Sequence, residues 1–171
     1  MIALPVGASA SRRRDARRLA LSVGLVLIGL WVIQAGATAD AVFAPLSVLT
    51  AQATAAMLAA IGLPVVRELT VLAHAGGFAC EISHACTALT PAALLAAAIL
   101  PQPVSRRARL IGVTAGTIAL ILLNQVRLVS LVWLGVHAPA YFDATHGLLW
   151  PGFLALATAG YYFGWMRTMH C

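Results

Sequence analysis

Charged side chains are scarce in this sequence of 171 residues. Asp, Glu, Lys and Arg together make up 9% of the chain, and hydrophobic residues make up 61%. A soluble domain has roughly 25% charged and 45–50% apolar residues. So few charges cannot cover the surface of a water-soluble protein of this size, which excludes a soluble globular domain. The composition predicts an integral membrane protein with a single domain.

Positive charge spread over a surface is also missing, although the net charge is +6. Most of the arginines fall in two short clusters, Arg12–Arg18 (RRRDARR) and Ser105–Arg109 (SRRAR). Such clusters are typical of the cytoplasmic loops of membrane proteins, whereas nucleic-acid-binding domains carry basic patches interleaved with aromatic residues. We therefore expect no nucleic-acid partner, a basic cytoplasmic N-terminus over residues 1–18, and one membrane domain over residues 19–171.

The short alternating segments of a membrane β-barrel are absent as well. Long apolar runs replace them, at residues 19–36, 44–63, 85–100, 110–134 and 148–166. About 20 apolar residues in a helix span a bilayer. The predicted fold class is therefore an all-α integral membrane protein with about four to five transmembrane or re-entrant helices.

Two further segments have a composition of their own. Residues 64–84 interleave β-branched residues with charged ones and contain the pair Gly76-Gly77, which predicts a short irregular or β-hairpin-like segment. Residues 137–147 (HAPAYFDATHG) are predicted to form a polar loop. The last apolar run closes with Tyr161, Tyr162 and Trp165, which we interpret as an interfacial aromatic belt.

The positive-inside rule orients the helices. Both arginine clusters lie in the cytoplasm only if residues 44–63 do not cross the membrane, so we expect that segment to be interfacial or re-entrant on the outer side. Residues 64–84 and 137–147 then lie on the extracytoplasmic face. The expected location is the cytoplasmic (inner) membrane, with several spans and the N-terminus in the cytoplasm. A cleaved signal peptide over the first apolar run is the weaker alternative.

Arg127 is the sharpest anomaly because it lies inside an apolar run (NQVRLVSLVWLG). A charged residue within a membrane segment costs roughly 2.5–3.5 kcal/mol and usually marks a functional site. The alternative is a side chain that reaches up to the membrane interface from near the helix end. Asn124 lies three residues earlier and shares one helical face with Arg127, so we expect this face to point into a helix bundle.

Cys86 stands where an apolar run begins, and the partial positive charge at a helix N-terminus favours a reactive thiolate. An ordinary buried cysteine is the alternative. Cys80 lies in the hairpin-like segment, and a Cys80–Cys86 disulfide would block any nucleophile at Cys86.

His146 begins the last helix and is a candidate acid or base near neutral pH, with His74, His84 and His137 as rivals on the same face. A thiol, an imidazole and a guanidinium together suit nucleophilic catalysis. A zinc site built from the side chains of Cys80, His84, Cys86 and His146 is the alternative, but their spacing matches no strong zinc pattern. We expect neither a metal nor another cofactor.

The order of these residues resembles the exosortase/archaeosortase family of membrane-embedded cysteine transpeptidases, most closely its short, core-only bacterial forms. The resemblance covers roughly residues 63–166. It is carried by the motifs ACTAL (Ala85–Leu89), NQVR (Asn124–Arg127) and THG (Thr145–Gly147). In the family the cysteine motif usually runs A-C-S-G or A-C-N-G, and Thr87-Ala88 replaces its last two residues here.

The resemblance implies a protein-sorting peptidase or transpeptidase. Its partners would be membrane-anchored proteins with a C-terminal signal made of a short motif, a transmembrane helix and a basic tail. Cys86 would form a thioester, and Arg127 would stabilise the oxyanion or orient the substrate. His146 would act as general acid and then as base, and Asn124 would orient Arg127 or bind the substrate backbone. The acceptor would be an amine or hydroxyl on a surface polymer or lipid, or water.

Two other classes of function stay open at this stage. In the first, the protein is a non-catalytic membrane subunit or small transporter, and Asn124 and Arg127 serve in packing or in an ion path. In the second, Cys80 and Cys86 form a metal or redox site. Only the transpeptidase gives Cys86, Arg127 and His146 a role together.

Overall fold

The computed structural model describes residues 17, 20–21, 24–25, 28 and 37–170. The predicted basic N-terminus and the predicted first helix, at residues 19–36, fall almost entirely outside these residues. From residue 37 onward the chain is mainly helical and carries one small antiparallel sheet. The hairpin-like segment predicted for residues 64–84 is thereby confirmed.

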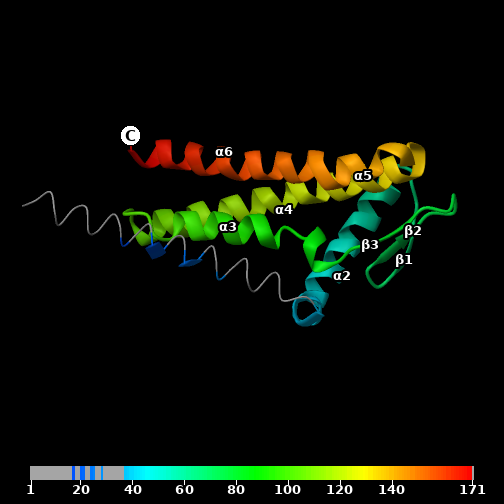
Figure 1. Cartoon of the computed structure of the whole chain (residues 1–171), viewed down its shortest axis with the longest axis horizontal. Coiled ribbons are helices and arrows are strands. Elements are labelled where there is room, and N and C mark those ends of the chain that lie inside the picture. Colours follow the sequence, from blue (N-terminus) through cyan, green and yellow to red (C-terminus); the bar gives the residue numbers. More distant parts are fainter. Residues whose placement is uncertain (1–16, 18–19, 22–23, 26–27, 29–36, 171) are drawn as a thin grey trace, which may run out of the picture.

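The long helices are joined by short strands and turns (Figure 1). The helices are α2 (Ala37–Ala60), α3 (Leu89–Ile99), α4 (Arg106–His137) and α6 (Trp150–His170). The strands are β1 (Val66–Glu68), β2 (Val71–Ala73) and β3 (Ala79–Glu81). The short helical turns are η1 (His84–Cys86), η2 (Pro139–Tyr141), α5 (Phe142–Ala144) and the π-helical turn η3 (Thr145–Leu149).

Helices α3, α4 and α6 run side by side and form the body of the molecule (Figure 1). Two glycines on α4 let them approach closely. A Cβ at Gly112 would collide with the Trp165 ring, and one at Gly116 would collide with Leu95 of α3 and Tyr161 of α6. Small residues at such contacts are typical of membrane helices, whose packing cannot rely on the exclusion of water.

The aromatic residues of α6 pack into this bundle. Trp165 is 8% exposed, and the Tyr161 hydroxyl donates a hydrogen bond to the Gly112 carbonyl at 2.8 Å. The Tyr162 hydroxyl accepts one from Gln102 at 2.8 Å. These hydroxyls therefore bind protein partners, and the interfacial aromatic belt stays a prediction.

Helix α2 runs across the direction of the other three helices (Figure 1). It is fixed to α4 by a hydrogen bond from the Thr54 hydroxyl to the Gln125 side chain at 2.9 Å. It starts seven residues before the predicted run and passes through Pro45. A proline is tolerated in a membrane helix where neighbouring groups satisfy the freed carbonyl.

Two of the described helices, Ala41–Ala60 and Arg106–His137, are long and apolar enough to cross a bilayer. Helix α3 has 11 residues and is about 16 Å long, roughly half the thickness of the hydrocarbon core. The helix expected to cross the membrane at residues 85–100 is therefore shorter than predicted. The interfacial or re-entrant placement of residues 44–63 stays a prediction.

The sheet has the order β1-β2-β3 and lies at one end of the bundle, while the C-terminus lies at the other (Figure 1). Gly77 adopts a φ of +92° in the β2–β3 turn, a conformation that favours glycine. Leu72 and Ile82 are buried against α2 and α4. This packing fixes the chain just before Cys86.

Candidate active site

Cys86 is the last residue of turn η1, three residues before α3 begins. The predicted helix start at residue 85 is therefore wrong. The Thr87 hydroxyl donates to the His84 carbonyl at 2.6 Å and closes the turn. Helix α3 starts only at Leu89, which places Pro91 in its first turn, where its missing N–H has no cost.

The departure from the family's cysteine motif has no backbone consequence in this chain. Thr87 has φ −90° and ψ 167°, and Ala88 has φ −79° and ψ 12°. Both conformations are open to any L-residue. A glycine at position 88 is therefore not needed for this turn.

Asn124 connects the backbone of Cys86 to the side chain of Arg127. Its amide nitrogen donates to the Cys86 carbonyl at 2.9 Å, and its amide oxygen lies 3.4 Å from an Arg127 Nη1 donor. Asn124 is 2% exposed. The shared face predicted for Asn124 and Arg127 does point into the bundle, and it holds the guanidinium beside the cysteine turn.

Arg127 stays inside the protein. Its side chain is 7% exposed, so it does not reach out to the membrane interface. Its Nε is buried and has no hydrogen-bond partner. A buried donor of this kind is rare in folded proteins and calls for a partner that the free protein does not supply.

A cleft of about 280 Å³ contains Cys80, Cys86 and His146. Strand β3 and Ser83 form one wall, and α4 and Phe142 form the other. The Ser83 hydroxyl lies 4.0 Å from the Cys86 sulfur, at the limit of a weak hydrogen bond. The thiol and the imidazole predicted to act together therefore lie in one cavity.

Cys80 lies in the same cleft with different properties. Both thiols are free, so the two cysteines form no disulfide in this structure. Burial, followed by the proximity of Cys86, raises the pKa of Cys80 to about 11. Among the described residues, no three His, Cys, Asp or Glu side chains gather closely enough to hold a metal ion.

His146 lies in the π-helical turn that precedes α6, one turn after Phe142. The imidazole stacks on the Phe142 ring, with centroids 5.6 Å apart and planes at 5°. Phe142 in turn contacts Phe78 edge-on, with the ring centroids 5.4 Å apart. Phe78 lies so close to Gly135 of α4 that a Cβ there would collide with its ring.

Burial lowers the pKa of His146, the positive charge of Arg127 lowers it further, and Asp143 partly opposes both. The imidazole is therefore mainly neutral at pH 7 and can accept a proton. Its Nδ1 is buried without a hydrogen-bond partner. Stacking on Phe142 thus supplies orientation where many catalytic histidines rely on a carboxylate.

The residues around His146 are more ordered than the sequence suggested. The predicted polar loop at residues 137–147 is wrong, because residues 139–149 wind into successive helical turns. Sequence reasoning also missed Phe142 and Ser83. The spacing of four residues between Phe142 and His146 was the available signal, since such a pair shares one helical face.

Two of the rival histidines are engaged elsewhere. The His74 Nδ1 accepts from the Gly76 N–H at 3.0 Å within the β2–β3 turn. His137 stacks on Trp133 with ring centroids 4.6 Å apart. His84 lies in turn η1 and does not line the cleft.

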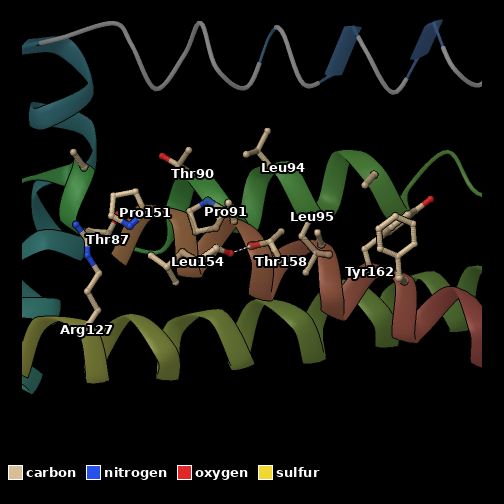
Figure 2. A pocket seen from close by; sticks show the side chains of 15 residues that line it. Thr87, Thr90, Pro91, Leu94, Leu95, Arg127, Pro151, Leu154, Thr158 and Tyr162 are labelled. Atoms are coloured by element: carbon tan, nitrogen blue, oxygen red, sulfur yellow. Dashed lines mark hydrogen bonds between the residues drawn. The ribbon is translucent and has the colours of Figure 1, made fainter. Parts of the chain in front are cut away.

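A second cavity lies on the other side of the cysteine turn. It is a groove of about 550 Å³ that runs along α3 and α6, with Arg127 at one end (Figure 2). Ala85 and Thr87, the neighbours of Cys86, line the groove, whereas Cys86 lines the cleft. Turn η1 therefore separates the cleft that contains the Cys86 thiol and the His146 imidazole from an apolar groove.

A family model described as transmembrane exosortase (Exosortase_EpsH) matches residues 1–163. The chain belongs to the transmembrane exosortase family. It is accordingly a membrane-embedded protein of a family with protease or transpeptidase activity on proteins that carry sorting signals. No curated protein and no solved structure matches the chain.

Proposed function

We propose that the protein is a cysteine transpeptidase or protease that cleaves the C-terminal sorting signal of exported, membrane-anchored proteins. One observation carries the proposal. Cys86 and His146 share a cleft, and Asn124 ties the backbone of Cys86 to Arg127. Two buried nitrogens at this place, Arg127 Nε and His146 Nδ1, have no hydrogen-bond partner within the protein.

In the first half of the reaction, the imidazole of His146 takes the proton of the Cys86 thiol. The sulfur then attacks the scissile carbonyl carbon, and the negative charge moves to the carbonyl oxygen. Arg127 stabilises this oxyanion, and its buried setting strengthens the attraction. His146 gives the proton to the leaving amine as the C–N bond breaks, which leaves a thioester on Cys86.

In the second half, an acceptor hydroxyl, amine or water molecule attacks the thioester. His146 takes the proton from the acceptor and returns it to the departing sulfur. The lowered pKa of His146 suits this role, because the imidazole must be neutral at the start of each half-reaction.

The orientation in the membrane follows from the positive-inside rule. The loop before the arginines at 106–109 lies beside the C-terminal half of α6, as the bond from Gln102 to Tyr162 indicates. The sheet lies at the opposite end of the bundle (Figure 1), and its strand β3 lines the cleft. With the arginines in the cytoplasm, the reactive cleft opens on the extracytoplasmic side of the inner membrane, where exported substrates are found.

Trapping of the acyl intermediate tests the proposal. The purified protein is mixed with a short peptide that carries a candidate sorting motif, quenched in acid and digested for mass spectrometry. We expect an acyl adduct on the peptide that contains Cys86 and none after Cys86→Ala. An unmodified Cys86 with every motif that undergoes processing in cells would contradict a thioester mechanism.

The same experiment separates the alternatives. A non-catalytic subunit or transporter predicts no adduct on any cysteine, and a redox site predicts oxidation of Cys80 and Cys86 in place of acylation. A metal site has little support, because no ligand cluster forms among residues 37–170.

A further inference from the structure

The groove along α3 and α6 has the lining of a helix-binding surface. Helix α6 presents Ala155, Thr158 and Ala159 to it, and α3 presents Thr90 and Ala98. Ala155 and Ala159 are four residues apart, the spacing at which small residues let two membrane helices approach closely. These small side chains leave a concave, largely apolar wall (Figure 2).

The groove also runs in the direction that a membrane helix requires and is long enough to hold about half of one. It follows α6 from Pro151 to Phe163, a rise of about 18 Å. The hydrocarbon core of a bilayer is about 30 Å thick, so the groove extends through roughly its outer half. A helix packed in the groove would run parallel to α3 and α6.

Arg127 at the end of the groove adds a polar requirement. It is more than nine-tenths buried, lines the groove and has an unpartnered Nε. A purely apolar helix offers this donor nothing. The extended residues before the N-cap of a helix do, because the helical hydrogen bonds begin with the N-cap carbonyl and leave the earlier carbonyl oxygens free. The apolar run at residues 19–36 of this chain has no acidic side chain to pair with Arg127.

We propose that the groove binds the outer half of the substrate's transmembrane helix, with a carbonyl oxygen just before that helix bound by Arg127. This inference rests on the proposed function and adds the place where the anchor of the substrate docks. The peptide would leave the groove past Ala85 and Thr87, the two neighbours of Cys86. Docking of the helix would thus set which peptide bond reaches the thiol.

Photo-crosslinking tests the docking directly. Phe163 is 62% exposed and lines the groove, so it is replaced by p-benzoylphenylalanine in a Cys86→Ala background that retains uncleaved substrate. The probe is a single-pass fusion protein with a candidate sorting motif, a leucine-alanine helix and an arginine tail, in phospholipid vesicles. We expect a crosslink to the helix of the fusion protein. The same photoreactive residue at Leu122, which is 62% exposed on α4 and outside the groove, should give none.

The other results of this experiment would overturn the proposal. A crosslink to phospholipid would make the groove a lipid site, and a crosslink to residues 19–36 would make it the seat of the chain's own first apolar run. Equal crosslinking at Leu122, or none at Phe163, would mean that the substrate helix does not dock there.

Groove-filling substitutions provide a kinetic test. Ala155→Leu and Ala159→Leu should lower the ratio of the rate on the anchored fusion protein to the rate on a short peptide without the helix by at least tenfold. Ala119→Leu, exposed on α4 and outside both cavities, should leave this ratio at the wild-type value. An unchanged ratio in both groove variants would contradict the proposal. A wild-type protein that is acylated neither by the short peptide nor by the anchored fusion protein would instead contradict the proposed function, whatever the crosslink shows.

Discussion

The two cavities beside turn η1 differ in what they can do. The cleft of about 280 Å³ contains the Cys86 thiol and the His146 imidazole, and residues of strand β3 and of α4 line it. The groove of about 550 Å³ is larger, is lined mainly by apolar side chains of α3 and α6, and carries a guanidinium at one end. One cavity is suited to bond breaking and the other to holding an apolar partner.

The difference fits the proposal that an anchored peptide is cut at the end of a membrane bundle. A peptide anchored in lipid can be cut only where its backbone leaves the hydrocarbon. In the proposed mechanism, turn η1 holds Cys86 at this boundary, with Ala85 and Thr87 on the groove side. Arg127 is connected to both cavities. Its side chain lines the groove, and Asn124 links it to the carbonyl of Cys86, which lines the cleft.

The two cysteines of the cleft should respond very differently to substitution. We expect Cys86→Ala to abolish processing of an anchored substrate and Cys80→Ala to change the rate by less than about threefold. With a pKa of about 11, only about one Cys80 in ten thousand is a thiolate at pH 7. Processing in cells is compared by immunoblot at matched membrane levels of the two variants. Equal losses would indicate that the thiols act as a pair, as in a redox or metal site.

Removal of the Arg127 charge tests how far the two cavities are coupled. Arg127→Ala should lower kcat/KM on a short peptide by about 10²- to 10³-fold, the usual loss when an oxyanion donor is removed. Arg127→Lys should recover little, because an ammonium lacks the planar fork that Asn124 now holds.

A loss of kcat/KM that is confined to anchored substrates would change the comparison of the two cavities. It would assign Arg127 to the groove alone and leave the oxyanion to other donors. The amount of each variant in the membrane serves as the control, because an unpaired Asn124 could also destabilise turn η1.

The stack behind His146 should have a smaller effect. Phe142→Leu removes the ring that faces the imidazole, a contact worth about 0.5–1.5 kcal/mol, so we expect a two- to tenfold loss of kcat/KM. The pH profile of kcat/KM should move too. Without the Phe142 ring the imidazole of His146 is less buried, so its pKa returns toward the ordinary value. Phe153→Leu is the matched control, since Phe153 contacts Trp150 and lies outside the cleft. Equal losses in both variants would reduce Phe142 to a packing residue.

The proposed site residues were easier to select from the sequence than the bounds of the elements that carry them. Cys86, Arg127 and His146 stand out because each is a polar group beside apolar runs, and such placements are costly. The start of α3 was misplaced because hydropathy does not register the Thr87 hydroxyl that closes turn η1.

The features that sequence reasoning missed depend on contacts between distant segments. Phe78 reaches Phe142 from the β2–β3 turn, and Gly135 leaves room for its ring. The groove exists because small residues of α3 and α6 face each other, and neither helix alone reveals this. Periodicity indicates which face of a helix is apolar, but the partner of that face comes from the tertiary structure.

Substitution of Asp143 should have the smallest effect, because Asp143 acts only on the pKa of His146. Its carboxylate raises the pKa of His146, against burial and the charge of Arg127, which lower it. Asp143→Asn removes the raising influence, so the pKa of His146 should fall further below its ordinary value. Because the reaction requires a neutral imidazole, the acid limb of kcat/KM should move to lower pH by a fraction of a unit.

The measurement is the rate of cleavage of a short peptide between about pH 4.5 and 8, a range that brackets the ordinary histidine pKa. Asp143 is exposed and contributes nothing to the walls of either cavity, so the rate on the alkaline plateau should stay near the wild-type value. An alkaline limb that moves to lower pH in the variant, with no shift of the acid limb, would mean that the imidazolium of His146 is the active form. His146 would then act first as an acid, and the thiol of Cys86 would need a different base.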